Sequence, residues 1–425
     1  MTGRPHLAIA CCVLLAAGCA KAPTTSPEPG PAGDDGRNWP AFGRTSDVTH
    51  YSPLDQVNVD TVQRLGLAWT LDLDVGNSIT EPLAIDGVVY LGAGHGVVHA
   101  VDAKSGRLLW RYDAKAPEVA GKKLRVAWGI RGIAYDMGRI YSGTTDGRLL
   151  ALNAKDGTLA WSAQTVDPDN GATITGAPRI CAGNVIIGFS GGDFGALRGY
   201  VTAYDAKSGE QRWRFYFVPG EPGTTDGAAS DEVMEMAAKT WTGEWWHLGG
   251  GGAAWNAITC DPEFGRVYVG TGNGTPMNWK IRSPGGGDNL FIASVVALDA
   301  GTGRHAWHYQ TTPADSWDYD SATDMTLATL VIDGAPRKVM LHAAKNGFLY
   351  VIDRATGKPL SAEKLGTVTW AERVDLVTGR PVLTPGAKYE EKNILLWPSF
   401  QAVHHWTPQA LSPRTGLLYV PTLEM

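Results

Sequence analysis

The chain has 425 residues, of which 44% are hydrophobic and 19% are charged, and its formal net charge is −6. This is the composition of a globular protein large enough to bury a substantial core, and its mild acidity leaves no basic surface of the kind that binds nucleic acid. Its 53 glycines and its few long helix-forming runs favour an all-β chain rich in turns.

The first residues have the pattern of an export signal. Arg4 precedes an apolar run over residues 7–17, which is too short to cross a bilayer as a helix and fits the core of a signal peptide. Residues 15–19 resemble a bacterial lipobox, although Ala16 stands where leucine is commonest. We therefore predict a lipoprotein signal peptide over residues 1–18 and lipidation of Cys19. An ordinary secretory signal is the alternative, and either one exports the protein.

Residues 19–37 are rich in Pro, Gly and Thr and contain almost nothing to bury, which predicts a flexible linker. If Cys19 carries lipid, only Cys181 and Cys260 remain in the folded part. Two thiols predict no disulfide framework, so we expect both to be buried as small hydrophobic side chains. The predicted location is the periplasm, with membrane attachment through the lipid anchor only.

One unit recurs along the chain. An apolar strand leads to an Asp or Asn, a turn closes on Gly, and a second strand carries a Trp eight positions after the Asp or Asn. The copies are Asp102 with Trp110, Asn153 with Trp161, Asp205 with Trp213, Asp299 with Trp307, and a degraded copy at Asp353. A spacing of about 50 residues between the first three Trp suits four-stranded propeller blades. We expect these Trp to pack between neighbouring blades and to have no catalytic role.

The repeat predicts an all-β propeller over residues 38–425, with strands for about six blades. Residues 219–237 interrupt the repeat with a loop rich in Gly, Pro and Asp, and a short helix is predicted over residues 231–239. The sequence stops inside a blade-like pattern, whereas a propeller closes on itself to avoid open edges. We favour a fragment of a longer protein over an unusual route of closure.

Chemistry-bearing residues gather between positions 249 and 320. Asp318 and Asp320 are two positions apart, so on an extended segment their carboxylates leave the same face and repel each other unless a cation or a shared proton lies between them. A hard cation could fill this place, with Asn273 as a neutral oxygen ligand. The alternative is that Asp315, Asp318 and Asp320 are solvated turn residues with Asx-type hydrogen bonds.

The order of motifs here resembles the cofactor-binding region of the pyrroloquinoline quinone (PQQ) dependent alcohol dehydrogenases, the methanol and ethanol dehydrogenase family. A glycine-rich turn precedes Trp255, a Gly-x-Gly-Asn motif ends at Asn273, a Pro-Gly-Gly-Gly-Asp-Asn motif follows, and Trp-Asp-Tyr surrounds Asp318. The resemblance extends from Asn38 to the end of the chain. It implies an eight-bladed propeller, of which about six blades are represented here.

The resemblance implies a role for each member of the predicted site. Trp255 would stack on the cofactor, and the guanidinium of Arg131 would bind its carboxylates. Asp318 would be the catalytic base. The predicted cofactor-binding residues are Arg131, Thr175, Ser190, Trp255 and Lys345, and the predicted metal ligands are Asp193, Asn273, Asp318 and Asp320. Asp193 stands where the family usually has Glu.

The metal implied by the resemblance is calcium or a lanthanide. Calcium-type members often carry a small residue where Asp320 stands, whereas lanthanide-dependent members carry Asp, and an added carboxylate suits a trivalent ion. The sequence thus favours a lanthanide. The implied reaction converts an alcohol to an aldehyde by hydride transfer to PQQ, and electrons then pass to a separate carrier such as a c-type cytochrome.

Several positions depart from the family pattern. Arg125-Val126 replace an adjacent cysteine pair, Glu81 is offset by two positions from an expected contact, and His405 stands where Asn is usual. The adjacent His404 and His405 lack metal-ligand spacing, so packing or hydrogen bonding is expected of them.

Two other functions remain open at this point: a non-catalytic propeller lipoprotein, resembling the scaffold of the outer-membrane assembly machinery, and a decayed relative that binds cofactor poorly. A scaffold has no reason to keep the family's site residues in order. That order favours the enzyme, and the residues that carry it are Arg131, Trp255, Asn273, Asp318, Asp320 and Lys345.

Overall fold

The computed structural model describes residues 35–424 except 77, 125–128 and 193–194. The predicted signal peptide, Cys19, most of the linker, Arg125-Val126 and Asp193 lie outside the described residues. Within the described part, no helix has both the length and the apolar character needed to cross a bilayer.

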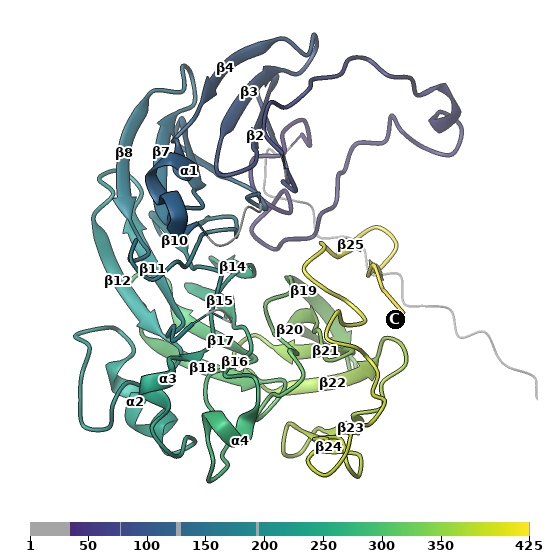
Figure 1. Cartoon of the computed structure of the whole chain (residues 1–425). Helices are drawn as coiled ribbons and strands as arrows, with labels where there is room; N and C mark the ends of the chain where they lie inside the picture. Colours follow the sequence, from purple (N-terminus) through teal and green to yellow (C-terminus); the bar gives the residue numbers. More distant parts are fainter. Residues whose placement is uncertain (1–34, 77, 125–128, 193–194, 425) are drawn as a thin grey trace, which may run out of the picture.

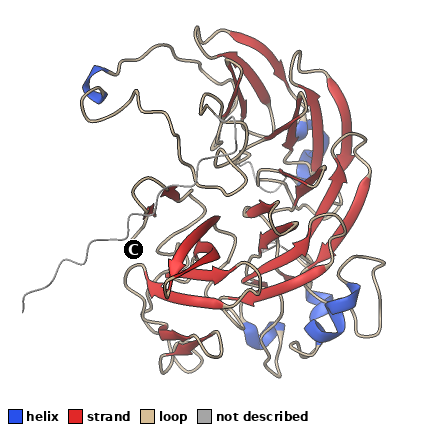
Figure 2. Cartoon of the chain, turned by 180° about the vertical axis from the view of Figure 1, so that it is seen from behind, coloured by secondary structure: helices blue, strands red, loops and turns tan. Residues whose placement is uncertain are grey.

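Five four-stranded antiparallel sheets follow one another in an arc around a central axis (Figures 1 and 2). The first sheet contains β1 (Leu83–Ile85), β2 (Val88–Gly92), β3 (Val98–Asp102) and β4 (Leu108–Tyr112). The second contains β5 (Ala134–Asp136), β6 (Arg139–Gly143), β7 (Arg148–Asn153) and β8 (Leu159–Gln164). The third contains β9 (Arg179–Cys181), β10 (Asn184–Ile187), β11 (Tyr200–Asp205) and β12 (Gln211–Tyr216).

The fourth sheet contains β14 (Ile258–Asp261), β15 (Arg266–Gly270), β17 (Ser294–Asp299) and β18 (His305–Gln310). The fifth contains β19 (Met325–Ile332), β20 (Ala335–Ala343), β21 (Phe348–Asp353) and β22 (Pro359–Lys364). Three short pairs complete the strands: β13 (Gly250–Gly251) with β16 (Gly274–Thr275), β23 (Ala371–Asp375) with β24 (Arg380–Leu383), and β25 (Ala410–Ser412) with β26 (Leu417–Tyr419).

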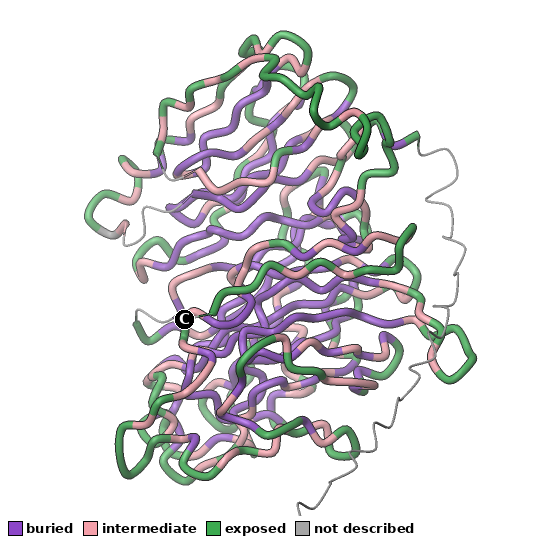
Figure 3. Tube along the Cα trace, turned by 90° about the vertical axis from the view of Figure 1, so that its right-hand side faces the viewer, coloured by how far each residue is buried: buried purple, intermediate pink, exposed green. Residues whose placement is uncertain are grey.

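Helices are short and lie in the connections. They are η1 (Val62–Arg64), α1 (Ala116–Ala120), η2 (Gly121–Lys123), α2 (Asp231–Ala238), α3 (Trp245–Leu248) and α4 (Trp279–Arg282). The helix predicted over residues 231–239 is therefore confirmed as α2. The prediction of an all-β propeller is also confirmed, but the strands expected for about six blades form five complete sheets and short pairs. Figure 3 shows buried residues along the interior of the trace and exposed residues mainly on the turns at its edges.

The recurring Trp joins each sheet to the next, as predicted. Trp110 on β4 donates its indole N–H to the carbonyl of Ala154 at 2.9 Å. A Cβ atom on Gly157 would lie 2.6 Å from the Trp110 ring, and the backbone φ of Gly157 is +73°, so only glycine fits this turn. The same hydrogen bond recurs from Trp161 to Ala206, from Trp213 to Ala300 and from Trp307 to Arg354.

Trp69 makes this contact too, with the Ala103 carbonyl at 3.0 Å and with its ring against Gly106. Half-buried Trp69, Leu71 and Leu73 alternate with exposed neighbours, which is the pattern of a strand with one buried face. Residues 65–73 nevertheless pair with no strand among the described residues. This segment thus has the inter-blade contact of an outer strand without a sheet of its own.

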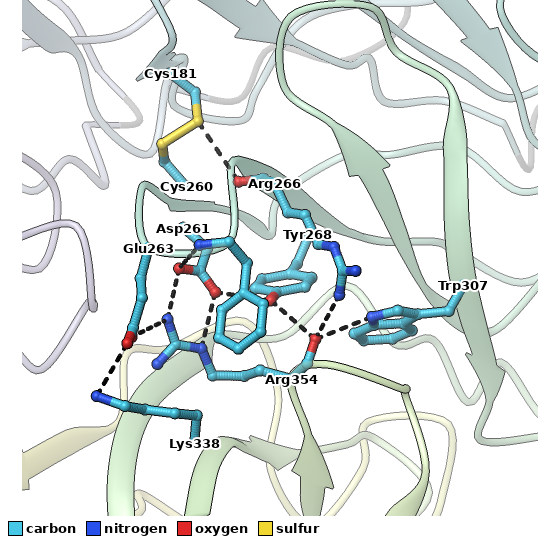
Figure 4. A network of polar contacts seen from close by, with 10 residues as sticks. Cys181, Cys260, Asp261, Glu263, Arg266, Tyr268, Trp307, Lys338 and Arg354 are labelled. Atoms are coloured by element: carbon cyan, nitrogen blue, oxygen red, sulfur yellow. Dashed lines mark hydrogen bonds and ion pairs between the residues drawn. A yellow bond between two sulfur atoms is a disulfide. The ribbon is translucent and has the colours of Figure 1, made fainter.

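Cys181 and Cys260 form a disulfide between β9 and β14, the first strands of the third and fourth sheets (Figure 4). The expectation of two separate buried thiols was wrong. Their Cα atoms lie 5.5 Å apart although 79 positions separate them in the chain. The propeller brings the two strands side by side, and no local pattern in the sequence reports that contact.

We expect the double variant Cys181→Ala with Cys260→Ala to lose about 2–4 kcal/mol of unfolding free energy, because the disulfide restricts the unfolded chain. Urea denaturation under oxidising conditions measures the difference. Wild-type protein treated with a reductant should match the variant. Equal urea midpoints for the oxidised wild type and the variant would contradict the prediction.

Beside the disulfide, a buried ion pair joins the fourth sheet to the fifth (Figure 4). Arg354 donates to both carboxylate oxygens of Asp261, at 2.8 and 2.5 Å, and the hydroxyl of Tyr268 donates to Asp261 Oδ2 at 2.7 Å. The carbonyl of Arg354 in turn accepts the indole N–H of Trp307 at 3.0 Å. These contacts fix the relative position of the two sheets whose loops carry Trp255, Asp318 and Lys345.

Candidate active site

The described members of the predicted site all lie at one end of the propeller. Some precede the first strand of a sheet, namely Arg131, Thr175, Trp255, Asp318 and Asp320, and the others follow a second strand, namely Ser190, Asn273 and Lys345. Because neighbouring strands are antiparallel, the start of the first strand and the end of the second lie at the same edge. The topology therefore gathers residues that are far apart in the sequence.

Arg131, Thr175 and Ser190 form a hydrogen-bonded chain. Arg131 Nη1 donates to Thr175 Oγ1 at 2.5 Å, and the hydroxyls of Thr175 and Ser190 are 2.5 Å apart. The Arg131 side chain is buried and its Nε has no hydrogen-bond partner. Burial lowers the pKa of Arg131 to about 10. A buried guanidinium with spare donor capacity is suited to an anionic ligand.

The Arg131 guanidinium also lies close to two indole rings. Its central carbon is 4.8 Å from the ring centroid of Trp255 and 5.0 Å from that of Trp406. Trp255 donates its indole N–H to Asp320 Oδ2 at 3.0 Å. Trp255 thus connects the Arg131 cluster to the carboxylates.

Lys345 lies between the two carboxylates of the Trp-Asp-Tyr-Asp motif. Its Nζ is 3.0 Å from Asp318 Oδ2 and 3.4 Å from Asp320 Oδ2. The side chains of Lys345 and Asp320 are only 2% and 4% exposed, whereas that of Asp318 is 20% exposed. Asp318 is therefore the more solvent-accessible carboxylate of this pair.

Burial and the charge of Asp320 raise the pKa of Asp318 to about 8, against the opposing effect of Lys345. Burial disfavours the charged form of Lys345, but Asp320 and Asp318 outweigh it and raise the pKa of Lys345. When Asp318 is ionised, the two carboxylates and the one ammonium carry a net negative charge, which a bound cation would offset. The backbone of Asp318 has φ +68°, a conformation that side chains other than Gly seldom adopt and that is commoner at functional sites.

Asp315 has a different role from its two neighbours. Its Oδ1 accepts the backbone N–H groups of Trp317 at 3.1 Å and Tyr319 at 3.2 Å. These are the turn-forming bonds of the alternative interpretation, although Asp315 is fully buried rather than solvated. Its carboxylate orients the turn that presents Asp318.

Among the described residues, no three Asp, Glu, His or Cys side chains form a group that could hold a metal ion. The buried Asn273 follows Gly272, where a Cβ atom would lie 3.4 Å from the Trp255 ring. Asp320 Oδ1 and Asp315 Oδ2 are buried without a hydrogen-bond partner. Oxygen donors with unused lone pairs suit a hard cation, and Asp193, the fourth predicted ligand, lies outside the described residues.

Residues 39–368 match the PQQ family described as the glucose/ethanol/alcohol dehydrogenase beta-propeller domain. The chain belongs to this PQQ family. It is 51% identical to the quinohemoprotein alcohol dehydrogenase ADH IIB of Pseudomonas putida, over 92% of this chain and 56% of that protein. It is 45% identical to the quinohemoprotein alcohol dehydrogenase of Comamonas testosteroni, over 90% of this chain and 54% of that protein.

Solved structures of the PQQ family superpose closely on this chain. The crystal structure of the Comamonas testosteroni enzyme has a TM-score of 0.87 at 44% identity and covers 92% of this chain and 58% of its own. A europium-containing methanol dehydrogenase has a TM-score of 0.82 at 33% identity and covers 91% of this chain and 69% of its own. The chain spans little more than half the length of the curated relatives it matches.

Two positions that depart from the family pattern have clear contacts in this PQQ-family chain. The Glu81 carboxylate accepts the Trp39 indole N–H and the Gly43 amide, each at 2.8 Å, and pairs with His50 at 3.0 Å, so it holds the N-terminal segment in place. The His405 ring packs against Trp255, with 6.0 Å between ring centroids.

The other histidine of the pair, His404, contacts the carbonyl of Pro421 at 2.9 Å through its Nδ1. Packing and hydrogen bonding were expected of His404 and His405, and both occur. Two residues near the site were missed by sequence reasoning, Trp406 and the fully buried Arg282. Only its place beside His405 could have suggested Trp406, and no sequence pattern indicates Arg282.

Proposed function

We propose that this protein is a PQQ- and metal-dependent dehydrogenase that oxidises an alcohol to an aldehyde. The observation that carries the proposal is the continuous set of contacts from Arg131 through Trp255 and Asp320 to Lys345 and Asp318. These contacts join a buried guanidinium, an indole ring and a carboxylate of raised pKa, which supports a site for an anionic, flat cofactor. A non-catalytic scaffold would have no use for this burial of charge, which costs stability.

The residues present fit PQQ, a flat tricarboxylate quinone. Trp255 offers the stacking surface, and Arg131, Thr175 and Ser190 offer donors for carboxylates. Lys345 offers an ammonium for the quinone oxygens. When bound, PQQ supplies the hydride acceptor that amino-acid side chains lack.

For the metal we propose Asn273, Asp318 and Asp320 as ligands, together with Asp193. The net negative charge of Asp318, Asp320 and Lys345 when Asp318 is ionised supports a highly charged ion, and Asp320 favours a lanthanide over calcium. The europium-containing relative supports the same choice. A bound metal would supply Lewis-acid polarisation of an oxygen beside it.

In the proposed reaction, Asp318 would accept the hydroxyl proton of the alcohol while the carbinol carbon gives its hydride to the acceptor that bound PQQ would supply. Lys345 stabilises negative charge that develops next to it, because its ammonium is buried and held by two carboxylates. The hydrogen bond from Trp255 keeps the Asp320 carboxylate oriented.

We further propose that a c-type cytochrome or another separate carrier takes the electrons, and that the protein is exported and anchored through Cys19. A relative is named 1-butanol dehydrogenase (cytochrome c), which supports the carrier. The Cys181–Cys260 disulfide supports an oxidising compartment such as the periplasm.

The test is dye-linked oxidation of a primary alcohol by purified protein reconstituted with PQQ and lanthanum, calcium or neither ion. We expect turnover with lanthanum above that with calcium and none without metal. Turnover with calcium alone would keep the enzyme and exclude the lanthanide. A folded sample that neither binds PQQ nor turns over would support the decayed relative or the scaffold.

The raised pKa of Asp318 gives metal binding a defined pH dependence. In the metal-free protein Asp318 is protonated below its pKa of about 8, and a metal ion must displace that proton. Lanthanum affinity should therefore rise about tenfold per pH unit between pH 5 and 7 and level off above pH 8. Tryptophan fluorescence titrations measure it, and Asp318→Asn should remove the slope. An unchanged affinity across this range would contradict the prediction.

A further inference from the structure

Two backbone segments carry the candidate metal ligands of the described part, and a direct hydrogen bond joins them at one end. The Asn273 segment consists of residues 271–277, and the carboxylate segment consists of residues 315–321. The backbone N–H of Ser321 donates to the carbonyl of Thr271 at 3.0 Å. This hydrogen bond fixes one end only, so the separation of the ligands also depends on how the far ends are held.

At the far ends, the side chain of Arg282 connects the Asn273 segment to the carboxylate segment. Arg282 is the last residue of α4 and is fully buried. Its Nη1 donates to the carbonyls of Pro276 at 2.6 Å and Met277 at 3.1 Å, and its Nη2 donates to the carbonyl of Asp315 at 2.7 Å. One guanidinium therefore bridges the two segments, and the candidate ligands lie between this bridge and the hydrogen bond at the other end.

The guanidinium of Arg282 is itself held in place. Its Nε donates to Asn289 Oδ1 at 3.1 Å, and the side-chain amide of Asn289 donates to the Thr240 carbonyl at 3.2 Å. A Cβ atom on Gly274, which directly follows Asn273, would lie 2.5 Å from the central carbon of the guanidinium. The planar fork of Arg suits donation in several directions, whereas Lys offers a single ammonium.

Burial of this guanidinium has a cost for the fold. Burial lowers the pKa of Arg282 to about 10, and the charge of Asp315 opposes that effect, so the side chain stays charged at neutral pH. Its four hydrogen bonds offset the desolvation. An apolar side chain of similar length would fill the space without that cost, but it would not join the two segments.

We propose that Arg282 is a positioning residue for the proposed metal. It holds Asn273 at a fixed separation from Asp318 and Asp320 by bridging the segments that carry them. This rests on the proposed function, because the separation matters for binding only if these oxygens share one ion. A change at a residue that orients metal ligands costs about tenfold to a hundredfold in metal affinity.

The first test is lanthanum binding without PQQ, followed by tryptophan fluorescence, in two variants of Arg282. Arg282→Lys keeps the charge and part of the donor capacity, so it should bind lanthanum about tenfold more weakly than wild type. Arg282→Met has a side chain of similar volume but no donor, so it should bind about a hundredfold more weakly. Wild-type affinity in both variants would overturn the proposal, and so would an equal loss in both, which packing alone would produce.

Arg139→Lys is the matched control. Arg139 on β6 also donates through Nη1 to two backbone carbonyls, those of Ala206 at 3.1 Å and Lys207 at 2.7 Å. These carbonyls lie in the turn between β11 and β12, outside both ligand-bearing segments. The same change there should leave lanthanum affinity within about twofold.

Asn289→Gly tests the same bridge even if the Arg282 variants do not fold. It removes one acceptor of the guanidinium, and the backbone φ of Asn289 is +61°, a conformation that glycine adopts without strain. We expect this variant to bind lanthanum about threefold more weakly than wild type, because the guanidinium is then less firmly held. An unchanged affinity would overturn the proposal.

A second measurement needs neither metal nor turnover. In the metal-free protein, amide hydrogen exchange followed by mass spectrometry should be about fivefold faster in Arg282→Lys over both the Asn273 segment and the carboxylate segment, and unchanged over the first sheet. Unchanged exchange in the two segments, or a uniform increase along the chain, would overturn the proposal. Faster exchange in both segments of a protein whose wild type binds no lanthanum would keep the bridge and remove the metal from the proposed function.

Discussion

Asp318→Asn is expected to lower kcat for alcohol oxidation by about a hundredfold to ten-thousandfold in the PQQ- and metal-loaded protein. The amide has nearly the shape of the carboxylate but cannot accept the proton of the alcohol. Asp318 is the more solvent-accessible carboxylate of the pair, and its contact with Lys345 at 3.0 Å places it at the centre of the site. The measurement is kcat at saturating alcohol and cofactor, with PQQ binding followed by tryptophan fluorescence.

Asp333→Asn is the matched control for this variant. Asp333 also has a positive φ, +52°, but it is exposed in the turn between β19 and β20. The same chemical change there should leave kcat and PQQ affinity within about twofold. If Asp318→Asn bound PQQ normally and kept more than about a tenth of wild-type kcat, another group would have to take the proton.

The sequence predicted the blades because their determinants are local. The turn after Asp102 is held by that side chain, whose Oδ1 accepts the backbone N–H of Ser105 at 2.8 Å, and the Trp eight positions later then falls on the outer strand. Cys181 with Cys260 could not be predicted in the same way, because their contact depends on how neighbouring sheets are placed. Arg282 was missed for a similar reason, since most of its partners are backbone carbonyls, those of Pro276, Met277 and Asp315, which any residue type can offer.

In the acidic motif, residue spacing alone could not predict the separate roles of the three carboxylates. It could not separate Asp315, which holds the turn, from Asp318 and Asp320, which face Lys345. The family resemblance supplied that distinction, and the structure gives it a physical basis. Antiparallel pairing brings Lys345, from the loop after β20, to the residues that precede β19.

Lys345→Met in the metal-free protein is expected to lower the free energy of unfolding by about 3–5 kcal/mol, because it leaves the buried Asp320 and the partly exposed Asp318 without their cation. The loss should be smaller at pH 6 than at pH 9. Below its pKa of about 8 Asp318 is already protonated, and removal of the ammonium raises that pKa further. Urea denaturation in the presence of a chelator measures the difference.

Repeating the urea denaturation with bound lanthanum distinguishes an electrostatic role of Lys345 from a packing role. A bound trivalent ion supplies the missing positive charge, so it should stabilise Lys345→Met more than wild type and reduce the difference between them. Lys338→Met is the matched control, because Lys338 is 38% exposed and its pair with Glu263 should contribute about 1 kcal/mol or less. If Lys345→Met lost the same free energy with and without lanthanum, the side chain would stabilise this site through its methylene groups rather than through its charge.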